Sequence, residues 1–315
     1  MKKIKMVLLT AVLGSFSGLW LGWWKAAPRQ VVGNQVIQRQ ATDEVRFFVL
    51  GDTGSGNDNQ LAVAAAMEAA CKAGSAPVGI LLLGDNFYMD GVESTSDSQW
   101  QSKMWAPYGG PCLGNIPIFA VLGNHDYKGK PEVQIAMSGQ NPRWVMPARN
   151  YAVRFGNLLE LDVLDSNFVD YCFSALLCAK DFLQARLSQP GVTWRFGLAH
   201  HPLVSSSTKY PDTTFAAYRK SVQPILCGNA DLFLSGHAHH MEHARLEKCS
   251  THFFIFGGGG ADLVPVLEGK AGSQFARAMH GFGDMIVTSN SIDVKFVGKD
   301  GATVYRSQIL KRKTH

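Results

Sequence analysis

Several features that mark common protein classes are missing from this chain of 315 residues. Its six cysteines include no pair with the C-x-x-C spacing of thiolate zinc sites, and no segment of the chain repeats another. The glycine run at 257–260 lacks the Lys-Ser/Thr that completes a phosphate-binding P-loop. We therefore interpret this run as a close-packed turn and expect neither a thiolate zinc site nor a P-loop nucleotide site.

An excess of charge is also missing from most of the chain. The formal net charge is +5, from 30 basic and 25 acidic residues. Residues 1–30 hold five of the basic residues and no acidic residue, so the remainder of the chain is formally neutral. A nucleic-acid-binding protein carries its excess positive charge in the folded domain. We therefore expect no nucleic-acid partner.

Residues 1–30 have the features of an export signal. Lys2, Lys3 and Lys5 precede an apolar stretch over 6–24, which is long for a signal peptide and close to the roughly 20 residues that span a bilayer. We predict a periplasmic or extracellular protein, with 1–27 either a cleaved signal peptide or a membrane anchor. The six cysteines fit an oxidising compartment and up to three disulfides, and the spacing of Cys172 and Cys178 permits a local loop.

Apolar runs and helical segments alternate after a polar, Gln-rich linker over 28–44. Several expected strands follow each other directly, so the pattern predicts a mixed α/β sandwich over 45–312 rather than a purely parallel sheet. We expect strands at 45–50, 79–83, 116–122, 194–198 and 231–234, a hairpin of 151–155 and 158–164, helices at 58–73 and 180–189, and a terminal antiparallel meander over 285–310.

Five short polar segments follow apolar runs in order along the chain. In α/β sheets, loops beyond the carboxyl ends of strands converge on one site. Any single Gly-Asp or Gly-Asn pair is ordinary turn chemistry, but five in series are not explained that way. The segments are Gly51-Asp52-Thr53-Gly54, Gly84-Asp85-Asn86-Phe87-Tyr88, Gly123-Asn124-His125-Asp126, Ala199-His200-His201-Pro202 and Gly236-His237-Ala238-His239.

These segments offer the ligands that two hard or borderline cations require. Such cations take carboxylate and imidazole ligands, and a pair of them shares at least one carboxylate. Two cations side by side are the machinery of phosphate-ester hydrolysis. The candidate ligands are Asp52, Asp85, Asn124, His200, His237 and His239.

The motif set resembles the calcineurin-type metallophosphoesterase superfamily, and within it the purple acid phosphatases of the small, tartrate-resistant type. The pattern of that subgroup is D-x-G, G-D-x-x-Y, G-N-H-[DE], V-x-x-H and G-H-x-H, and the match extends over roughly 45–310. One departure is Gly197, which stands where the pattern has Val and leaves His200 in place. The resemblance implies an α/β sandwich of two mixed β-sheets flanked by helices.

The first two motifs separate the subgroup from the rest of the superfamily. Most members have D-x-H as the first motif, whereas this chain has Gly54 at the third position and has Tyr88 as the alternative ligand. By resemblance, the first metal takes Asp52, Tyr88, His239 and the shared Asp85. The second takes Asp85, Asn124, His200 and His237. A phenolate favours Fe(III) in the first site, and the second site suits Fe(II), Zn(II) or Mn(II).

Three further residues are candidates for catalysis or substrate binding. His125 follows the ligand Asn124 and is placed to bind the phosphoryl oxygens or protonate the leaving alkoxide, oriented by Asp126. Asn124 itself also faces the substrate, and Lys209 lies nine residues after His200, where the family often has a substrate-facing histidine. A solvated loop lysine is an equal alternative for Lys209. His201, His240 and His243 are expected outside the coordination spheres.

The predicted function is an exported acid phosphatase that hydrolyses small phosphomonoesters with a metal-bound hydroxide at an Fe(III)–M(II) centre. One alternative is a phosphodiesterase or nucleotide pyrophosphatase on the same fold, which the missing D-x-H motif disfavours. Another is a metal-binding pseudoenzyme tethered at the membrane, which would be expected to have lost at least one ligand.

Overall fold

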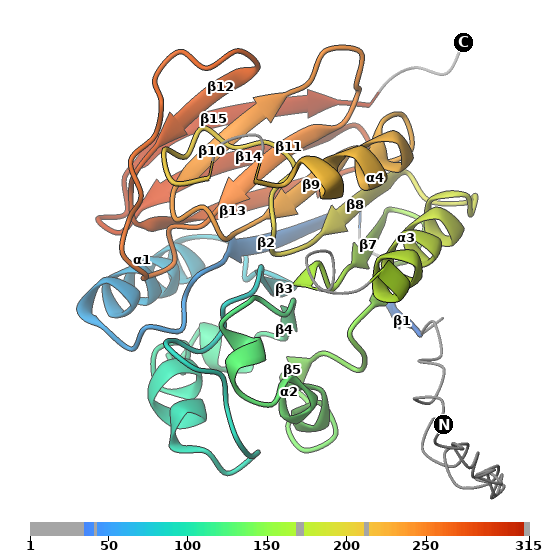
Figure 1. The fold of residues 1–315 in the computed structure, drawn as a ribbon. Helices are drawn as coiled ribbons and strands as arrows, with labels where there is room; N and C mark the ends of the chain where they lie inside the picture. Colours follow the sequence, from blue (N-terminus) through green and yellow to red (C-terminus); the bar gives the residue numbers. More distant parts are fainter. Residues whose placement is uncertain (1–34, 41–42, 168–172, 211–213, 312–315) are drawn as a thin grey trace, which may run out of the picture. The chain divides into compact units, whose positions relative to one another are not determined.

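Two mixed β-sheets face each other and helices cover their outer faces, as Figure 1 shows for the computed structural model. The structure describes residues 35–40, 43–167, 173–210 and 214–311. These residues fall within one compact unit, Val32–His315. The predicted α/β sandwich of two mixed sheets is confirmed.

The seven-stranded sheet has the order β15-β14-β13-β2-β3-β4-β5. Its four strands from the first half of the chain run parallel, and the terminal meander adds to β2 in antiparallel fashion. The strands are β2 (Glu44–Leu50), β3 (Gly79–Leu82), β4 (Ile118–Ala120), β5 (Trp144–Val145), β13 (Gly281–Thr288), β14 (Ser291–Gly298) and β15 (Thr303–Leu310).

The eight-stranded sheet has the order β1-β6-β7-β8-β9-β11-β10-β12. Its central strands β7, β8, β9 and β11 run parallel, so their carboxyl ends lie at one edge. The strands are β1 (Val36–Arg39), β6 (Tyr151–Phe155), β7 (Leu159–Val163), β8 (Trp194–Leu198), β9 (Leu232–Ser235), β10 (Met241–Arg245), β11 (His252–Phe256) and β12 (Ser273–Arg277).

In the described part of the chain, four α-helices lie outside the sheets. Helix α1 (Asp58–Ala73) is capped by Asn57, whose side chain accepts a hydrogen bond from the Gln60 backbone amide. Helices α3 (Phe173–Leu187) and α4 (Ala216–Leu226) pack side by side (Figure 1). Helix α2 is Pro131–Met137, and three short helical turns are Trp100–Trp105, Leu113–Asn115 and Asp126–Lys128.

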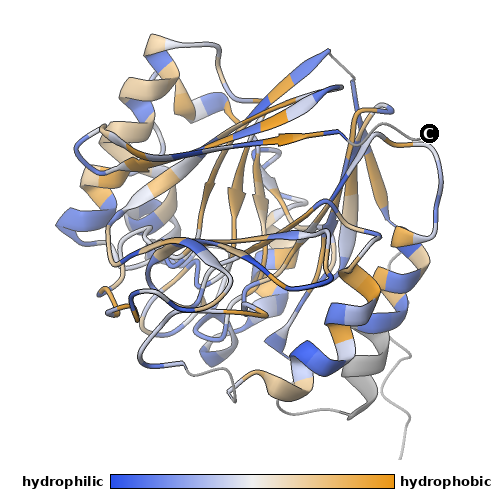
Figure 2. Ribbon diagram, turned by 90° about the horizontal axis from the view of Figure 1, so that it is seen from above, coloured by the Kyte–Doolittle hydropathy of each residue, from blue (hydrophilic) through white to orange (hydrophobic). Residues whose placement is uncertain are grey.

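The main core fills the space between the sheets. Phe47 of β2 packs edge-to-face on Phe155 of β6, with ring centroids 5.2 Å apart, so the two sheets share one apolar layer. A second cluster joins α3 and α4 to the other face of the eight-stranded sheet. Figure 2 shows the corresponding hydropathy, with orange along the strands and blue mainly on loops and outward turns of the helices.

Most predicted elements are confirmed, with shifts at their ends. The hairpin of β6 and β7 turns at Gly156, which has φ +49°, and the meander turns at Gly301, which has φ +82°. The meander begins earlier than expected, at Gly281, and helix α3 begins at Phe173 rather than near 180. The expected strand 116–122 is limited to Ile118–Ala120.

The predicted linker over 28–44 is wrong for its second half. Val36–Arg39 forms β1, which pairs in parallel with Ala152–Phe155 of β6. Val-Ile-Gln-Arg has two apolar residues followed by two polar ones and does not alternate, so no period-2 strand signal was available here. The predicted export segment over 1–27 lies outside the described residues.

Among the described residues, two disulfides are present, Cys71–Cys112 and Cys227–Cys249. The first ties α1 to the loop before β4, and the second joins the end of α4 to the loop before β11. The suggested pairing of Cys172 with Cys178 involves Cys172, which lies outside the described part. No described helix is long and apolar enough to cross a membrane.

Candidate metal centre

All seven predicted metal ligands come together where parallel strands of the two sheets end. Asp52 and Asp85 follow β2 and β3, and Asn124 follows β4. His200 follows β8, and the pair His237 and His239 follows β9. Tyr88 comes from the loop after β3. The expectation that loops at strand ends would build one site is confirmed in its geometry.

Tyr88 lies at the centre of the first ligand group. Its phenol oxygen is 3.0 Å from Asp52 Oδ1, 2.8 Å from Asp85 Oδ2 and 3.1 Å from His239 Nε2. His239 Nε2 is also 3.4 Å from Asp52 Oδ1. Two carboxylates, a phenol and an imidazole therefore present one atom each to a common point.

Asn124 lies at the centre of the second group. Its Oδ1 is 2.9 Å from His237 Nδ1 and 3.2 Å from His200 Nε2. The two imidazole nitrogens are 3.2 Å apart, and His200 Nε2 is 3.4 Å from Asp85 Oδ1. The second group therefore consists of an amide oxygen, a carboxylate and two imidazoles.

Asp85 belongs to both groups, with one oxygen in each. Its Oδ2 faces Tyr88, and its Oδ1 faces His200. This is the arrangement expected of a carboxylate that bridges two cations. The donor set therefore fits a dinuclear centre, because each group holds four ligand atoms of the types that iron and zinc accept.

The backbone at the ligands is strained. Five non-glycine residues in the described part have positive φ, and four of them are predicted ligands. Asp52 has φ 59°, Asp85 has φ 53°, His237 has φ 65° and His239 has φ 48°; the fifth residue is Lys248. Left-handed backbone at non-glycine residues is costly and concentrates at functional sites. The fold therefore pays a conformational penalty to aim these side chains inward.

Gly54 leaves room for the Tyr88 loop rather than for a ligand of its own. A Cβ at Gly54 would lie 2.1 Å from the Asn86 carbonyl oxygen and 2.4 Å from the Phe87 nitrogen. The two segments are joined by hydrogen bonds, with Tyr88 N–H donating to the Gly54 carbonyl at 2.8 Å. A histidine at position 54 is incompatible with this backbone. The absence of the D-x-H histidine and the presence of Tyr88 therefore have one steric cause.

Backbone carbonyl groups orient two of the ligand histidines. His200 Nδ1 lies 2.8 Å from the Leu83 carbonyl and His239 Nδ1 lies 2.7 Å from the Asp262 carbonyl. A ring N–H that donates to a carbonyl leaves the other nitrogen with its lone pair for a metal. In both residues that other nitrogen, Nε2, is the one that faces the ligand group.

The electrostatics of the first group favour a strongly polarising cation. Burial, together with the carboxylates of Asp52 and Asp85, raises the pKa of the Tyr88 phenol well above its usual value. Burial alone would raise the pKa of Asp85, but the positive charge of His200 lowers it below the usual range. The carboxylate is thus ready to bind a cation, whereas the phenol ionises only next to a strong Lewis acid.

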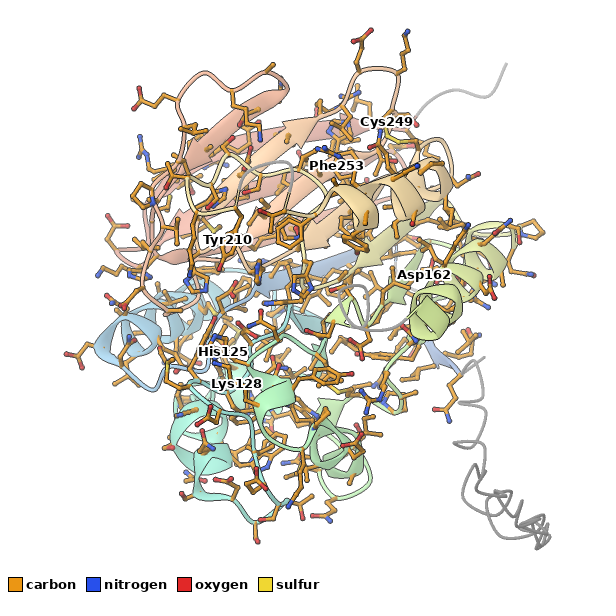
Figure 3. All side chains as sticks on the ribbon, in the orientation of Figure 1. His125, Lys128, Asp162, Tyr210, Cys249 and Phe253 are labelled. Carbon is orange, nitrogen blue, oxygen red and sulfur yellow. A yellow bond between two sulfur atoms is a disulfide. The ribbon has the colours of Figure 1, made fainter. Side chains whose placement is uncertain are left out.

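His125 lies at the edge of the first group. Its ring packs on that of Tyr88 at a centroid distance of 4.4 Å, and Nδ1 lies 2.6 Å from the Met89 carbonyl. Lys128 Nζ approaches the same nitrogen at 3.2 Å. Figure 3 shows His125 and Lys128 next to each other on the loop after β4. The Met89 carbonyl, rather than Asp126, orients the ring and leaves Nε2 available.

Asp126 has a different place from the one expected. Its carboxylate is buried and accepts hydrogen bonds from the backbone N–H groups of Asn86, Phe87 and Gly123. Gln134 Nε2 of α2 donates to it as well, at 2.8 Å. Asp126 therefore ties the Asp85 loop to the Asn124 loop. It holds two ligand-bearing segments in register and does not contact reacting atoms.

Lys209 is exposed near the second ligand group, and the next residue, Tyr210, contacts that group directly. The Tyr210 ring lies 4.4 Å from that of His237, centroid to centroid, and Lys209 Nζ lies 5.1 Å from the Tyr210 centroid. The sequence analysis missed Tyr210. Its place next to Lys209, ten residues after His200, was the available signal.

The glycine run 257–260 packs against the first group, as expected. A Cβ at Gly257 would lie 2.8 Å from the backbone nitrogen of His239, and one at Gly259 would lie 2.3 Å from the Gly51 carbonyl oxygen. The run therefore allows close approach of the backbone behind Asp52 and His239.

The sequence pattern of the calcineurin-like phosphoesterase family matches residues 45–241. The chain belongs to this family. The fold and the motif interpretation agree with that membership, and a metallophosphoesterase of this family is a hydrolase with a dinuclear metal centre.

Several relatives carry more specific names. Tartrate-resistant acid phosphatase type 5 of Oryctolagus cuniculus is 25% identical over 301 residues, covering 86% of this chain and 93% of the relative. Purple acid phosphatase 3 of Arabidopsis thaliana is 30% identical over 255 residues, covering 71% of this chain and 66% of the relative. The predicted resemblance to the purple acid phosphatases is confirmed.

Solved structures share the fold at lower identity. GAP50, the anchor in the inner membrane complex of Plasmodium, superposes with a TM-score of 0.75 at 23% identity, covering 86% of this chain and 90% of that one. The purple acid phosphatase PPD1 from yellow lupin seeds superposes with a TM-score of 0.68 at 16% identity, covering 87% of this chain and 55% of that one. These likenesses establish the architecture alone.

Proposed function

We propose that this chain is an exported acid phosphatase that hydrolyses small phosphate monoesters at an Fe(III)–M(II) centre. The observation that carries the proposal is the position of the Tyr88 phenol oxygen, within 3.1 Å of ligand atoms from Asp52, Asp85 and His239. A phenolate in this place favours Fe(III), because both are hard. Gly54 supports the same reading, since its backbone position excludes the histidine that other members of the superfamily use.

The seven ligands divide as the two geometric groups suggest. Asp52, Tyr88 and His239 would hold the first cation, and Asn124, His200 and His237 the second, with Asp85 shared. When bound, such a pair supplies Lewis acidity at the phosphoryl oxygens and an activated water for in-line displacement. The imidazole tautomers set by the Leu83 and Asp262 carbonyls keep the Nε2 lone pairs of His200 and His239 directed at the cations.

His125 is proposed to handle the leaving group. With Nδ1 donating to the Met89 carbonyl, the ring is fixed, and the imidazolium form can deliver its Nε2 proton to the leaving oxygen. His125 also stabilises negative charge on the phosphoryl group before the bond breaks.

Asn124, Lys128 and Lys209 are proposed to complete substrate recognition. The Asn124 Oδ1 belongs to the second ligand group, and its NH₂ group can donate to a phosphoryl oxygen. Lys128 next to His125 and Lys209 next to Tyr210 place positive charge on two sides of the site. Small anionic phosphomonoesters are therefore the proposed partners, and the neutral domain disfavours nucleic acid.

Export is part of the proposal. It rests on the basic and apolar character of residues 1–30 and on the two disulfides, which form in oxidising compartments. A membrane anchor through residues 6–24 remains the alternative to cleavage of the signal, and protein N-terminal sequencing after expression in an exporting host distinguishes the two.

The test compares a phosphomonoester with a phosphodiester. We expect p-nitrophenyl phosphate to be hydrolysed faster in acid than bis(p-nitrophenyl) phosphate, and Asn124→Ala to remove most of the activity without unfolding the chain. Faster hydrolysis of the diester would favour the phosphodiesterase alternative. Absence of any turnover in a protein with both cations bound would favour a pseudoenzyme, although all seven ligands are in place.

A further inference from the structure

Glu242 of β10 is a buried carboxylate outside both ligand groups, and three hydrogen-bond donors surround it. Its Oε2 accepts the Ser206 backbone N–H at 2.7 Å and lies 2.8 Å from His240 Nε2. Its Oε1 accepts the Ser206 hydroxyl at 2.6 Å. Glu242 is 1% exposed, and Ser206 and His240 are fully buried. Burying a carboxylate is costly unless donors of this kind satisfy both of its oxygens.

The surroundings of Glu242 favour its ionised form. Burial alone would raise the pKa of the carboxyl group, but the interaction with His240 and the hydrogen bonds from Ser206 bring that pKa below its usual value. An ionised carboxylate only accepts hydrogen bonds, and the bonds that it accepts are stronger than those between neutral groups. Glu242 therefore holds Ser206 by both its backbone and its side chain.

Ser206 lies in the segment 203–210, which ends at Lys209 and Tyr210. The Tyr210 ring packs on the His237 ring, with centroids 4.4 Å apart, so the end of this segment reaches the second ligand group. Few residues separate Ser206 from that end, and a shift of Ser206 would move both side chains. The bonds to Glu242 join this segment to β10, the strand that follows the histidine ligands.

We propose that Glu242 is a positioning residue, which holds the segment 203–210 so that Lys209 and Tyr210 form one wall of the substrate site. The inference rests on the proposed phosphomonoesterase function and concerns substrate binding rather than the cations. Its partners Ser206 and His240 are not predicted ligands. Release of the segment should therefore raise KM and leave kcat and the metal content close to their original values.

The first measurement is the split between KM and kcat for p-nitrophenyl phosphate, in protein loaded with both cations. Glu242→Ala removes every acceptor, and we expect it to raise KM about 10-fold and to change kcat less than about 2-fold. Ser206→Ala removes the hydroxyl alone and should raise KM about 3-fold, so it serves as the test if Glu242→Ala does not fold. Loss of kcat and of metal with an unchanged KM would overturn the inference.

Glu242→Gln tests whether the hydrogen bonds are what matters. The glutamine oxygen can accept the N–H groups of Ser206 and His240, while its NH₂ group can donate to the Ser206 hydroxyl. We expect KM to stay within about 2-fold of the original value, because all three contacts can be kept. A KM as high as that of Glu242→Ala would contradict this explanation of the contacts.

Thr251→Val is the matched control for Ser206→Ala. The Thr251 hydroxyl is also fully buried, and it donates to backbone carbonyl groups of Leu226 and Ala230 at the end of α4. We expect this variant to have an unchanged KM. Equal increases in KM for Thr251→Val and Ser206→Ala would overturn the inference, because a general loss of stability would then explain both.

The second measurement does not depend on turnover. Lys209 is exposed, and trypsin cleaves after lysine, so cleavage between Lys209 and Tyr210 reports release of the segment. Relative to cleavage after Lys248, which is 89% exposed, we expect it to be about 10-fold faster in Glu242→Ala. Equal rates would overturn the role of Glu242 and leave the proposed function intact. Unsubstituted protein that binds both cations but hydrolyses no phosphomonoester would instead overturn the proposed function itself.

Discussion

Replacing Gly54 tests why the first metal site uses a tyrosine. The Cβ of Gly54→Ala would lie 2.1 Å from the Asn86 oxygen, 2.3 Å from the Asn86 carbonyl carbon and 2.4 Å from the Phe87 nitrogen. All three atoms belong to the backbone, so no side chain can rotate away. The Tyr88 loop must move, although Asp126 holds it from the other side.

The size of the effect follows from what the movement breaks. Overpacking a tight contact costs about 1–3 kcal/mol. The hydrogen bonds that join the two segments, Gly54 N–H to the Asp85 carbonyl at 3.3 Å and Tyr88 N–H to the Gly54 carbonyl, are worth about 1 kcal/mol each. We expect the free energy of unfolding to fall by about 3–5 kcal/mol and iron binding to weaken, since Tyr88 is displaced.

Urea denaturation of metal-free protein and iron titration measure the two effects. Gly139→Ala is the control, because its Cβ would meet only the Ala136 carbonyl, at an ordinary 3.5 Å. It should change stability by less than about 0.5 kcal/mol. If Gly54→Ala is as stable as the control and binds iron equally well, the steric explanation for the missing D-x-H histidine is wrong. Gly54→His should likewise fail to restore iron binding in Tyr88→Phe.

Three further predictions concern catalysis and stability. His125→Gln should lower kcat by about 10²–10⁴-fold for alkyl phosphates and by less for p-nitrophenyl phosphate, whose leaving group needs little protonation; equal losses would refute proton donation. Asn124→Ala should bind one cation fewer by metal analysis while its circular dichroism is unchanged, and a full metal complement would contradict its role as a ligand. Burial, with the charge of Glu160, raises the pKa of Asp162 to about 7, above the unfolded value near 4. The folded state therefore binds a proton more tightly than the unfolded state, and the resulting contribution to the free energy of unfolding is complete below pH 4 and lost as the pH rises to 7. Relative to Asp162→Asn, the unsubstituted protein should therefore gain up to about 4 kcal/mol between pH 7 and pH 4, and parallel pH profiles in urea denaturation would argue against this.

That last effect depends on a buried charge cluster that no motif reveals. Asp162 lies on β7 beneath α3 (Figure 3), with Oδ1 at 3.5 Å from Arg186 Nε. Glu160 Oε1 forms ion pairs with Arg186 Nη2 at 2.6 Å and with Arg195 Nη1 at 2.8 Å. These residues look like surface positions in the sequence. Asp162, Glu160 and Arg195 are buried. Helix α3 supplies Arg186 to this cluster, and pairing between strands and a helix depends on tertiary packing.

The metal centre was predictable because its information is local. Each ligand stands in a short motif at the end of an apolar strand, and the chemistry of two cations limits the residue types that can serve. Gly54 and Tyr88 are complementary in the sequence, and the close approach of their two segments gives the physical reason. The parallel and meander strands were likewise visible as apolar or alternating runs.

Other features depend on contacts between distant segments. Strand β1 lies in a polar stretch whose four residues pair with β6, and only the partner makes it a strand. Asp126 was expected to orient His125, yet backbone N–H groups from the Asp85 loop engage it instead. The rings of Tyr210 and His201 pack on that of His237, but they stand in loops without a recognisable sequence motif at these positions.

The central claim is that Tyr88 binds Fe(III) in a dinuclear centre. The most direct test is metal analysis combined with a visible spectrum, on protein made in an exporting host and on Tyr88→Phe. We predict two metal ions per chain, at least one of them iron, and a violet or pink colour from phenolate-to-iron charge transfer that Tyr88→Phe loses. A colourless protein that contains two metal ions and no iron, or a variant that keeps the colour, would contradict the account.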